Sequence, residues 1–190
     1  MCTRTKSAKR IMALFVIYGV QNCGKTHTAW LIYSLLKNAG REIDFVPKSL
    51  THRPTFSEVL EQIRTSHATS AMMLFSDFRA LFEYKGKKIA VFSAGDALGC
   101  DIDEENPFNE DDFITFKNNM HWAELNEVDH VICCSRYNRT PGGVRKYILD
   151  NYRMHTYRWY CKNWKPSADE RVEDAQRIAI EVFIDIKENC

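Results

Sequence analysis

The chain has 190 residues, of which 45% are apolar and 27% are charged. These values are typical of a globular domain, and they exclude a disordered, collagen-like or coiled-coil chain. Lysine and arginine number 26 against 25 aspartates and glutamates, so the net charge of +1 argues against a uniformly basic nucleic-acid-binding protein. We expect a single domain over residues 1–190, in which residues 1–10 are a flexible basic N-terminus.

The cysteines and the apolar segments of the sequence indicate in which cellular compartment the protein is expected. The seven cysteines are odd in number and contain no C-x-x-C pair, which argues against a disulfide scaffold or a zinc ribbon. The apolar run over residues 11–18 has no cleavage signal after it, and at eight residues it is too short to span a bilayer. We therefore expect reduced thiols, a cytoplasmic location and no membrane partner.

Strands and helices alternate along the first half of the chain. A continuous apolar run marks a strand that is buried on both faces, whereas apolar residues at helical spacing mark an amphipathic helix. Four elements are predicted in chain order: a central strand (residues 11–18), a helix that stops at Gly40 (25–38), a short strand (43–46), and a helix that begins at Phe56 and ends near Ser66 or extends to about Phe75.

The second half of the chain continues this alternation. It predicts a hairpin with a turn at residues 85–86 (strands 77–84 and 87–93), a helix (111–125), a buried strand (128–134), a helix (144–152), an edge strand (155–161) and a helix capped by Ser167. Alternating strands and helices predict an α/β fold, a three-layer α/β/α sandwich with a mostly parallel sheet.

One motif carries chemistry. Residues 19–26 fit G-x-x-x-x-G-K-[ST] in full. The glycines let the backbone curl so that its N–H groups point at phosphate oxygens, and a helix that starts at Lys25 adds its positive end. The Lys25 ammonium would reach the β- and γ-phosphates, and the Thr26 hydroxyl would bind Mg²⁺. The predicted nucleotide-binding residues are Gly19, Val20, Gln21, Asn22, Cys23, Gly24, Lys25, Thr26 and His27.

On this motif and its alternating layout, the chain resembles the P-loop (Walker A) NTPase superfamily. The resemblance implies a P-loop NTPase-like fold, a bound nucleoside triphosphate (ATP or GTP) and Mg²⁺. It selects no single family, and the loop lacks the extra glycine that many nucleotide kinases carry at the position of Asn22.

An acidic residue follows the predicted strand at residues 87–93. Asp96 resembles the Walker B aspartate of the superfamily, which would hold Mg²⁺ together with Thr26. The alternative is an aspartate that caps a loop before a turn. The predicted metal ligands are therefore Thr26 and Asp96.

Basic residues follow the predicted strand at residues 128–134, at the end where open α/β sheets bind ligands. Arg136 and Arg139 there would neutralise charge that develops during phosphoryl transfer. A solvated loop whose arginines pack on acidic neighbours explains them equally well. With Lys25 and Asp96, these two arginines form the predicted catalytic group.

The remaining roles are left open by the sequence. Asp44 and Asp77 are candidate bases for a phosphate acceptor, and Gln21, Ser93 and His27 are candidates for positioning a water molecule. Each of them is also explained as an ordinary surface or packed residue.

Aromatic and basic residues are interleaved over residues 152–165, a pattern that can bind single-stranded nucleic acid. An edge strand with one face on the core explains the same pattern, and we expect no nucleic-acid partner.

The sequence thus predicts an enzyme, a hydrolase or a kinase. It would bind a nucleoside triphosphate (ATP rather than GTP) with Mg²⁺ and transfer the γ-phosphate to water or to a small-molecule or nucleotide acceptor. The alternative is a GTPase-like or nearly non-hydrolysing module that acts through a protein partner. Residues 96–99 fit the D-x-x-G pattern of GTPases, but residues 126–129 lack the lysine of a guanine-binding motif.

Overall fold

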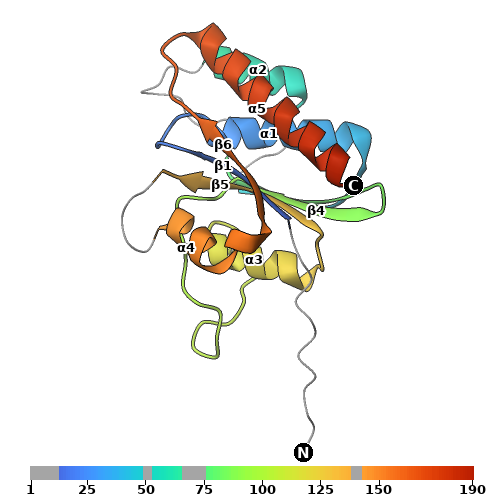
Figure 1. The fold of residues 1–190 in the computed structure, drawn as a ribbon, viewed down its shortest axis with the longest axis vertical. Coiled ribbons are helices and arrows are strands. Elements are labelled where there is room, and N and C mark those ends of the chain that lie inside the picture. The colour runs from blue at the N-terminus through green and yellow to red at the C-terminus, as the bar shows by residue number, and fades with distance from the viewer. Residues whose placement is uncertain (1–12, 49–52, 66–75, 138–142) are drawn as a thin grey trace, which may run out of the picture.

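A computed structural model describes residues 13–48, 53–65, 76–137 and 143–190 of the chain. These residues form an α/β fold, in which a six-stranded, mostly parallel sheet carries five α-helices (Figure 1). The predicted flexible tail over residues 1–10 lies outside the described residues. So does the segment that would decide whether the helix beginning at Phe56 ends near Ser66 or continues to Phe75.

The sheet has the strand order β2-β3-β4-β5-β1-β6. Four neighbouring strands run parallel: β4 (Lys87–Phe92), β5 (His130–Arg136), β1 (Ala13–Gly19) and β6 (Thr156–Lys162). Strand β3 (Phe78–Tyr84) pairs antiparallel with β4, which confirms the predicted hairpin, and β2 (Arg41–Pro47) pairs antiparallel with β3. The predicted edge strand is confirmed as β6, at one end of the sheet.

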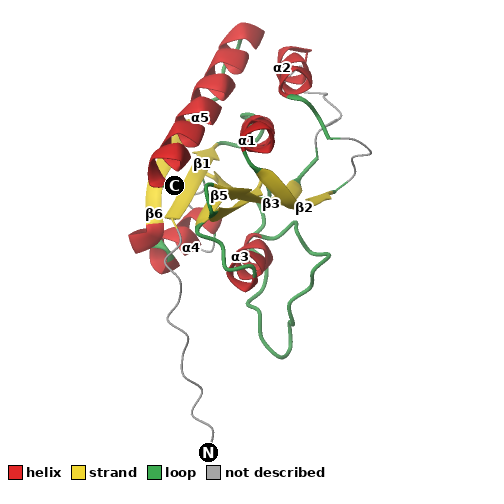
Figure 2. Cartoon of the chain, turned by 90° about the vertical axis from the view of Figure 1, so that its right-hand side faces the viewer, coloured by secondary structure: helices red, strands yellow, loops and turns green. Residues whose placement is uncertain are grey.

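Helices cover both faces of the sheet, as expected for three layers (Figures 1 and 2). One face carries α1 (Lys25–Ala39), α2 (Phe56–Thr65) and α5 (Ala168–Asn189), and the other carries α3 (Phe116–Leu125) and α4 (Val144–Asn151). A short 3₁₀ turn, Arg153–His155, leads into β6. Within the described residues, no helix combines the length and the apolar character needed to cross a bilayer.

Strand β1 lies at the centre of two cores. Phe15 and Ile17 pack on the side of α1 and α5, whereas Leu14 and Val16 pack on the side of α3 and α4. All four side chains are fully buried. This two-sided burial explains why the sequence of the strand is a continuous apolar run rather than an alternating one.

The helix predicted over residues 111–125 starts later than expected, at Phe116. The Phe116 N–H donates to the Ala97 carbonyl (2.9 Å), and the amide groups of Asn118 and Asn119 donate back to carbonyls of the loop that precedes the helix. Side-chain bonds of this kind compete with helical hydrogen bonds and hold the preceding segment as a loop. The other described element boundaries fall within two residues of the predicted ones.

A capping box holds the start of α5. The Ser167 hydroxyl accepts from the Glu170 N–H (3.1 Å), and the Glu170 carboxylate accepts from the Ser167 N–H (3.3 Å).

We expect Ser167→Ala to lower the free energy of unfolding by about 1 kcal/mol, measured by urea denaturation. Ser57→Ala, at an exposed position inside α2, is the control and should change it by less than about 0.5 kcal/mol. Equal effects of the two substitutions would contradict the capping role.

Candidate functional site

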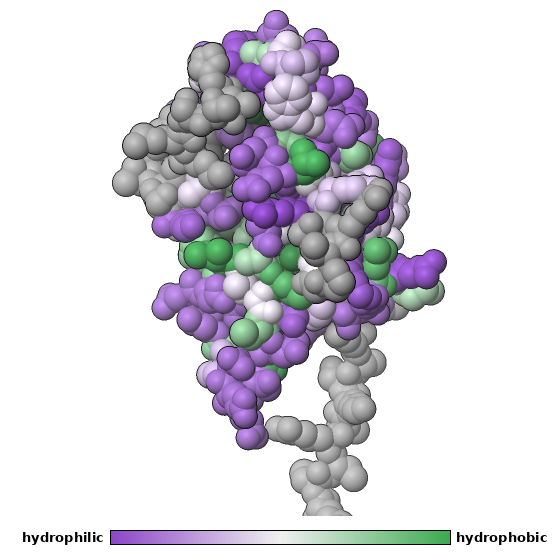
Figure 3. Space-filling model, turned by 90° about the vertical axis from the view of Figure 1, so that its left-hand side faces the viewer, coloured by the Kyte–Doolittle hydropathy of each residue, from purple (hydrophilic) through white to green (hydrophobic). Residues whose placement is uncertain are grey.

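The carboxyl ends of the parallel strands meet at one edge of the sheet. Gly19 at the end of β1 is the register partner of Arg136 on β5 and of Lys162 on β6. Open α/β sheets bind ligands at this edge. Figure 3 looks onto this side of the molecule, where hydrophilic side chains predominate.

The loop between β1 and α1, residues 19–24, is here called the glycine loop. Its glycines are required by the structure. A Cβ at Gly19 would lie 2.2 Å from the Lys162 carbonyl oxygen and 2.6 Å from the Cys23 sulfur, and Gly24 has a left-handed φ of +90°. No side chain caps the helix that follows, so the N–H groups of its first turn remain available to an anion.

Lys25 is buried, at 8% exposure, without an acidic partner. Its Nζ donates to the Val20 carbonyl (2.9 Å) and more weakly to the Gly19 carbonyl (3.4 Å). All 25 acidic residues of the chain lie in the described part, and none forms an ion pair with Lys25 within 4.0 Å. A buried charge is costly to hold without a counter-ion. The positive charge of Lys25 is therefore available to pair with an anion from outside the chain.

Asp96 and Arg136, two of the predicted catalytic residues, bind each other. Arg136 Nε lies 2.7 Å from Asp96 Oδ1, and Nη2 donates to Oδ2 at 2.8 Å. This contact raises the pKa of Arg136. Gly95 helps to place Asp96, because a Cβ there would lie 1.9 Å from the Cys134 carbonyl oxygen. The side chains of Asp96 and Arg136 are 51% and 34% exposed, and such surface pairs contribute less than about 1 kcal/mol.

The predicted metal ligands are not in contact. Asp96 follows β4, and β5 separates that strand from β1, whereas Thr26 lies in the first turn of α1. Among the residues that the structure describes, no cluster of three or more histidines, cysteines, aspartates or glutamates could hold a metal ion. A site built on Thr26 and Asp96 would need Asp96 to leave Arg136.

Arg145, at the start of α4, is a second cation with no acidic partner. Its guanidinium lies over the rings of Tyr137 (4.8 Å), Tyr18 (5.4 Å) and Trp159 (5.7 Å). It forms no ion pair with any of the acidic residues, all of which are described. Such cation–π contacts hold an arginine in place and leave its charge available. Arg139, the other predicted arginine, lies outside the described residues.

The two candidate bases, Asp77 and Asp44, lie at different positions in the sheet. Asp77 precedes β3, which starts at the edge where β4 ends, and it accepts a hydrogen bond from the Ser93 hydroxyl (2.9 Å). The same hydroxyl accepts from the Phe78 N–H (3.1 Å). Asp44 lies within β2, three residues before the strand ends, and accepts from the Phe45 N–H. The structure therefore places Asp77, and not Asp44, at the edge where the parallel strands end.

The interleaved aromatic and basic residues are largely used inside the fold. The Tyr160 hydroxyl and Arg158 both bind Asp185 on α5, and the Trp159 ring packs edge-on against Tyr18. These contacts agree with the edge-strand interpretation of the pattern.

Lys162 is the residue that sequence reasoning missed, because it was grouped with those aromatic neighbours. It is 2% exposed, and its Nζ lies 2.7 Å from the carboxylate of Asp174 on α5. Although burial opposes it, hydrogen bonds from Lys162 and Arg177 hold the pKa of Asp174 below its ordinary value. The sequence does contain one indication of this cluster. Asp174 and Arg177 lie one turn apart near the start of the last helix, which is the spacing of an ion pair.

Comparisons with known proteins identify no relative. No protein-family model matches the chain, and neither the curated proteins nor the solved structures contain a significant match. The arguments for function therefore come from the residues at the edge of the sheet.

His27, in the first turn of α1, makes the stability of the folded protein depend on pH. Burial, and then the charge of Lys162, lower the pKa of His27 from 6.5 to about 4. Between these values the unfolded chain binds a proton that the folded chain does not bind. We expect the wild type to lose up to about 3 kcal/mol more than His27→Gln as the pH falls from about 6.5 to 4, measured by urea denaturation. Parallel pH profiles of the two proteins would contradict this expectation.

Proposed function

We propose that the chain binds the phosphate tail of a nucleoside triphosphate, ATP or alternatively GTP, together with Mg²⁺, and that it transfers the γ-phosphate. The observation that carries this proposal is Lys25, a buried ammonium without a carboxylate, beside a loop that requires glycine at Gly19 and Gly24. The helix α1 adds the uncapped N–H groups of its first turn. In this proposal the fold is a three-layer sandwich of the P-loop NTPase type.

Lys25 and the glycine loop would do the binding. The ammonium would exchange the carbonyls of Val20 and Gly19 for phosphate oxygens, which are stronger, charged acceptors. The loop N–H groups and the first turn of α1 would surround the remaining oxygens. These fixed donors stabilise the charge that develops on the transferring phosphoryl group.

This edge carries a hydroxyl group, on Thr26, and a carboxylate, on Asp96, and Mg²⁺ prefers oxygen donors of this kind. Thr26 and Asp96 would hold the ion, and its charge would neutralise the phosphate oxygens. Asp96 is held only by a surface ion pair with Arg136, so an incoming phosphate group could take the arginine and release the carboxylate. Nucleotide binding and metal binding would then be coupled.

The arginines and Asp77 supply the remaining functions. Arg145 has no carboxylate to leave, so it needs only to move away from its three aromatic rings to reach a phosphate. Arg136 and Arg139 would assist it. Asp77, oriented by the Ser93 hydroxyl, would accept the proton of an attacking hydroxyl group.

The first test is binding. We expect ATP with Mg²⁺ to raise the melting temperature of the wild type and to have no such effect on Lys25→Met, whose affinity should fall at least about tenfold. Without nucleotide, Lys25→Met should melt at the same or a higher temperature than the wild type, because it removes a buried charge that has no partner. Lys37→Met, in the last turn of α1, is the control with the same charge change. An equal effect of ATP on all three proteins would contradict the proposal.

The second test is turnover. γ-Labelled ATP with Mg²⁺ is incubated with the protein and a pool of small metabolites and nucleoside monophosphates. We expect label on an acceptor or as free phosphate, and a loss of about 100-fold in kcat for Arg145→Gln. Arg64→Gln, an exposed arginine of α2, should be without effect.

Label on an organic molecule would make the protein a kinase, and free phosphate would make it a hydrolase. Binding without any release of label would overturn the enzymatic proposal in favour of a module that acts through a protein partner. Unchanged turnover in Arg136→Gln, Arg139→Gln and Arg145→Gln would remove the arginines from the mechanism.

A further inference from the structure

Lys162 occupies a position that a lysine rarely takes. It ends the edge strand β6, yet its side chain is only 2% exposed, and its ammonium is held 2.7 Å from Asp174. The second oxygen of Asp174 is held by Arg177 at 2.8 Å. Lysines are almost never buried to this extent without a counter-ion. The ion pair therefore fixes Lys162 beneath the surface of the protein.

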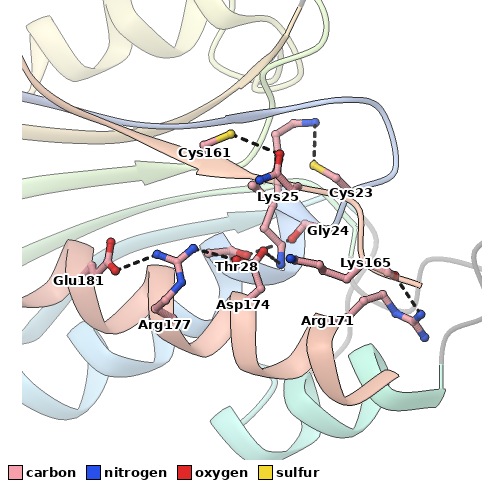
Figure 4. Close-up of polar contacts among 12 residues, drawn as sticks. Cys23, Gly24, Lys25, Thr28, Cys161, Lys165, Arg171, Asp174, Arg177 and Glu181 are labelled. Carbon is pink, nitrogen blue, oxygen red and sulfur yellow. Dashed lines mark hydrogen bonds and ion pairs between the residues drawn. The ribbon is translucent and has the colours of Figure 1, made fainter. Parts of the chain in front are cut away.

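Lys162 contacts the glycine loop at two positions. Its carbonyl oxygen lies 2.2 Å from where a Cβ of Gly19 would stand, and its Cε lies 3.6 Å from where a Cβ of Gly24 would stand. One residue thus contacts the first and the last glycine of the loop. Figure 4 shows Asp174 of α5 beside Gly24 and Thr28, so α5 closes the same cluster from the other side.

The charge of Lys162 acts on a side chain of the glycine loop. Together with Lys25, the charge of Lys162 opposes the rise that burial causes in the pKa of Cys23. Lys162 and Lys25 are two buried lysines that both contact the glycine loop. They differ in their partners, because Lys25 has no carboxylate and Lys162 is held by Asp174.

We propose that Lys162 is a positioning residue for the glycine loop, and that its buried charge makes the site prefer a triphosphate over a monophosphate. This inference rests on the nucleotide-binding function proposed above. A fixed charge in a poorly solvated site attracts a ligand in proportion to the ligand's own charge. Without Mg²⁺, the phosphate tail of ATP carries about twice the charge of that of AMP, so the effect on log Kd is about twice as large for metal-free ATP.

The test compares two affinities in each protein. Kd is measured in buffer without Mg²⁺, by calorimetry for ATP and by competition for AMP. We expect Lys162→Met to weaken ATP binding about tenfold and AMP binding about threefold, so the preference for ATP falls about threefold. Lys162→Arg keeps the charge and should keep the preference, even if both affinities fall. Lys165→Met makes the same change of net charge three residues away and should leave the preference unchanged.

A purely structural role of Lys162 predicts a different result. If Lys162 only held the loop in place, its loss would lower the affinities for ATP and AMP by the same factor. An unchanged preference in Lys162→Met therefore overturns the inference. If that variant does not fold, Lys162→Met is combined with Asp174→Asn, and its preference is compared with that of Asp174→Asn alone, so that the two proteins differ only in the charge of Lys162. Failure of the wild type to bind ATP would overturn the proposed function and this inference together, whereas ATP binding with an unchanged preference overturns this inference alone.

Discussion

The approach of Gly19 to the backbone of Lys162 is the constraint on which the candidate site depends. No side chain fits between them, because a Cβ would stand 2.2 Å from a carbonyl oxygen. The parallel pairing of β1 with β6 therefore continues to the point where the chain leaves the sheet, and the glycine loop starts from a fixed position. Lys25 and the first turn of α1 take their places from that start. A larger residue at Gly19 would separate the two strands and displace the loop.

Four cations of the described residues lie at this edge, and they fall into two classes. Arg136 and Lys162 are paired with Asp96 and Asp174, in an exposed and in a buried ion pair respectively. Lys25 and Arg145 have no carboxylate. Folding alone favours the paired arrangement, so the unpaired cations lower the stability of the free protein. Destabilising features of this kind are typical of sites that bind an external charge.

Local patterns in the sequence predicted most of the fold. The apolar run of β1, the motif at residues 19–26 and the capping box at Ser167 each depend on residues that are close in sequence. The partners at the site could not be predicted in this way. Asp96 meets Arg136, and Lys162 meets the glycine loop, only because the strand order brings β4 beside β5 and β1 beside β6. Periodicity gives the strands but not their order across the sheet, and it gave no reason to place Arg145 among three aromatic rings.

The same strand order has a consequence for how the protein folds during synthesis. Strand β1 precedes β6, one of its two neighbours in the sheet, by roughly 140 residues, so this pairing closes a long stretch of chain and is of the kind that forms slowly. Until it forms, the apolar residues of β1, from Leu14 to Ile17, have no complete core to enter. Until β6 has been made, this strand therefore presents unpaired backbone and apolar side chains, a combination that favours aggregation. The glycine loop that follows this strand therefore takes its final shape only after Lys162, which it contacts, has been made.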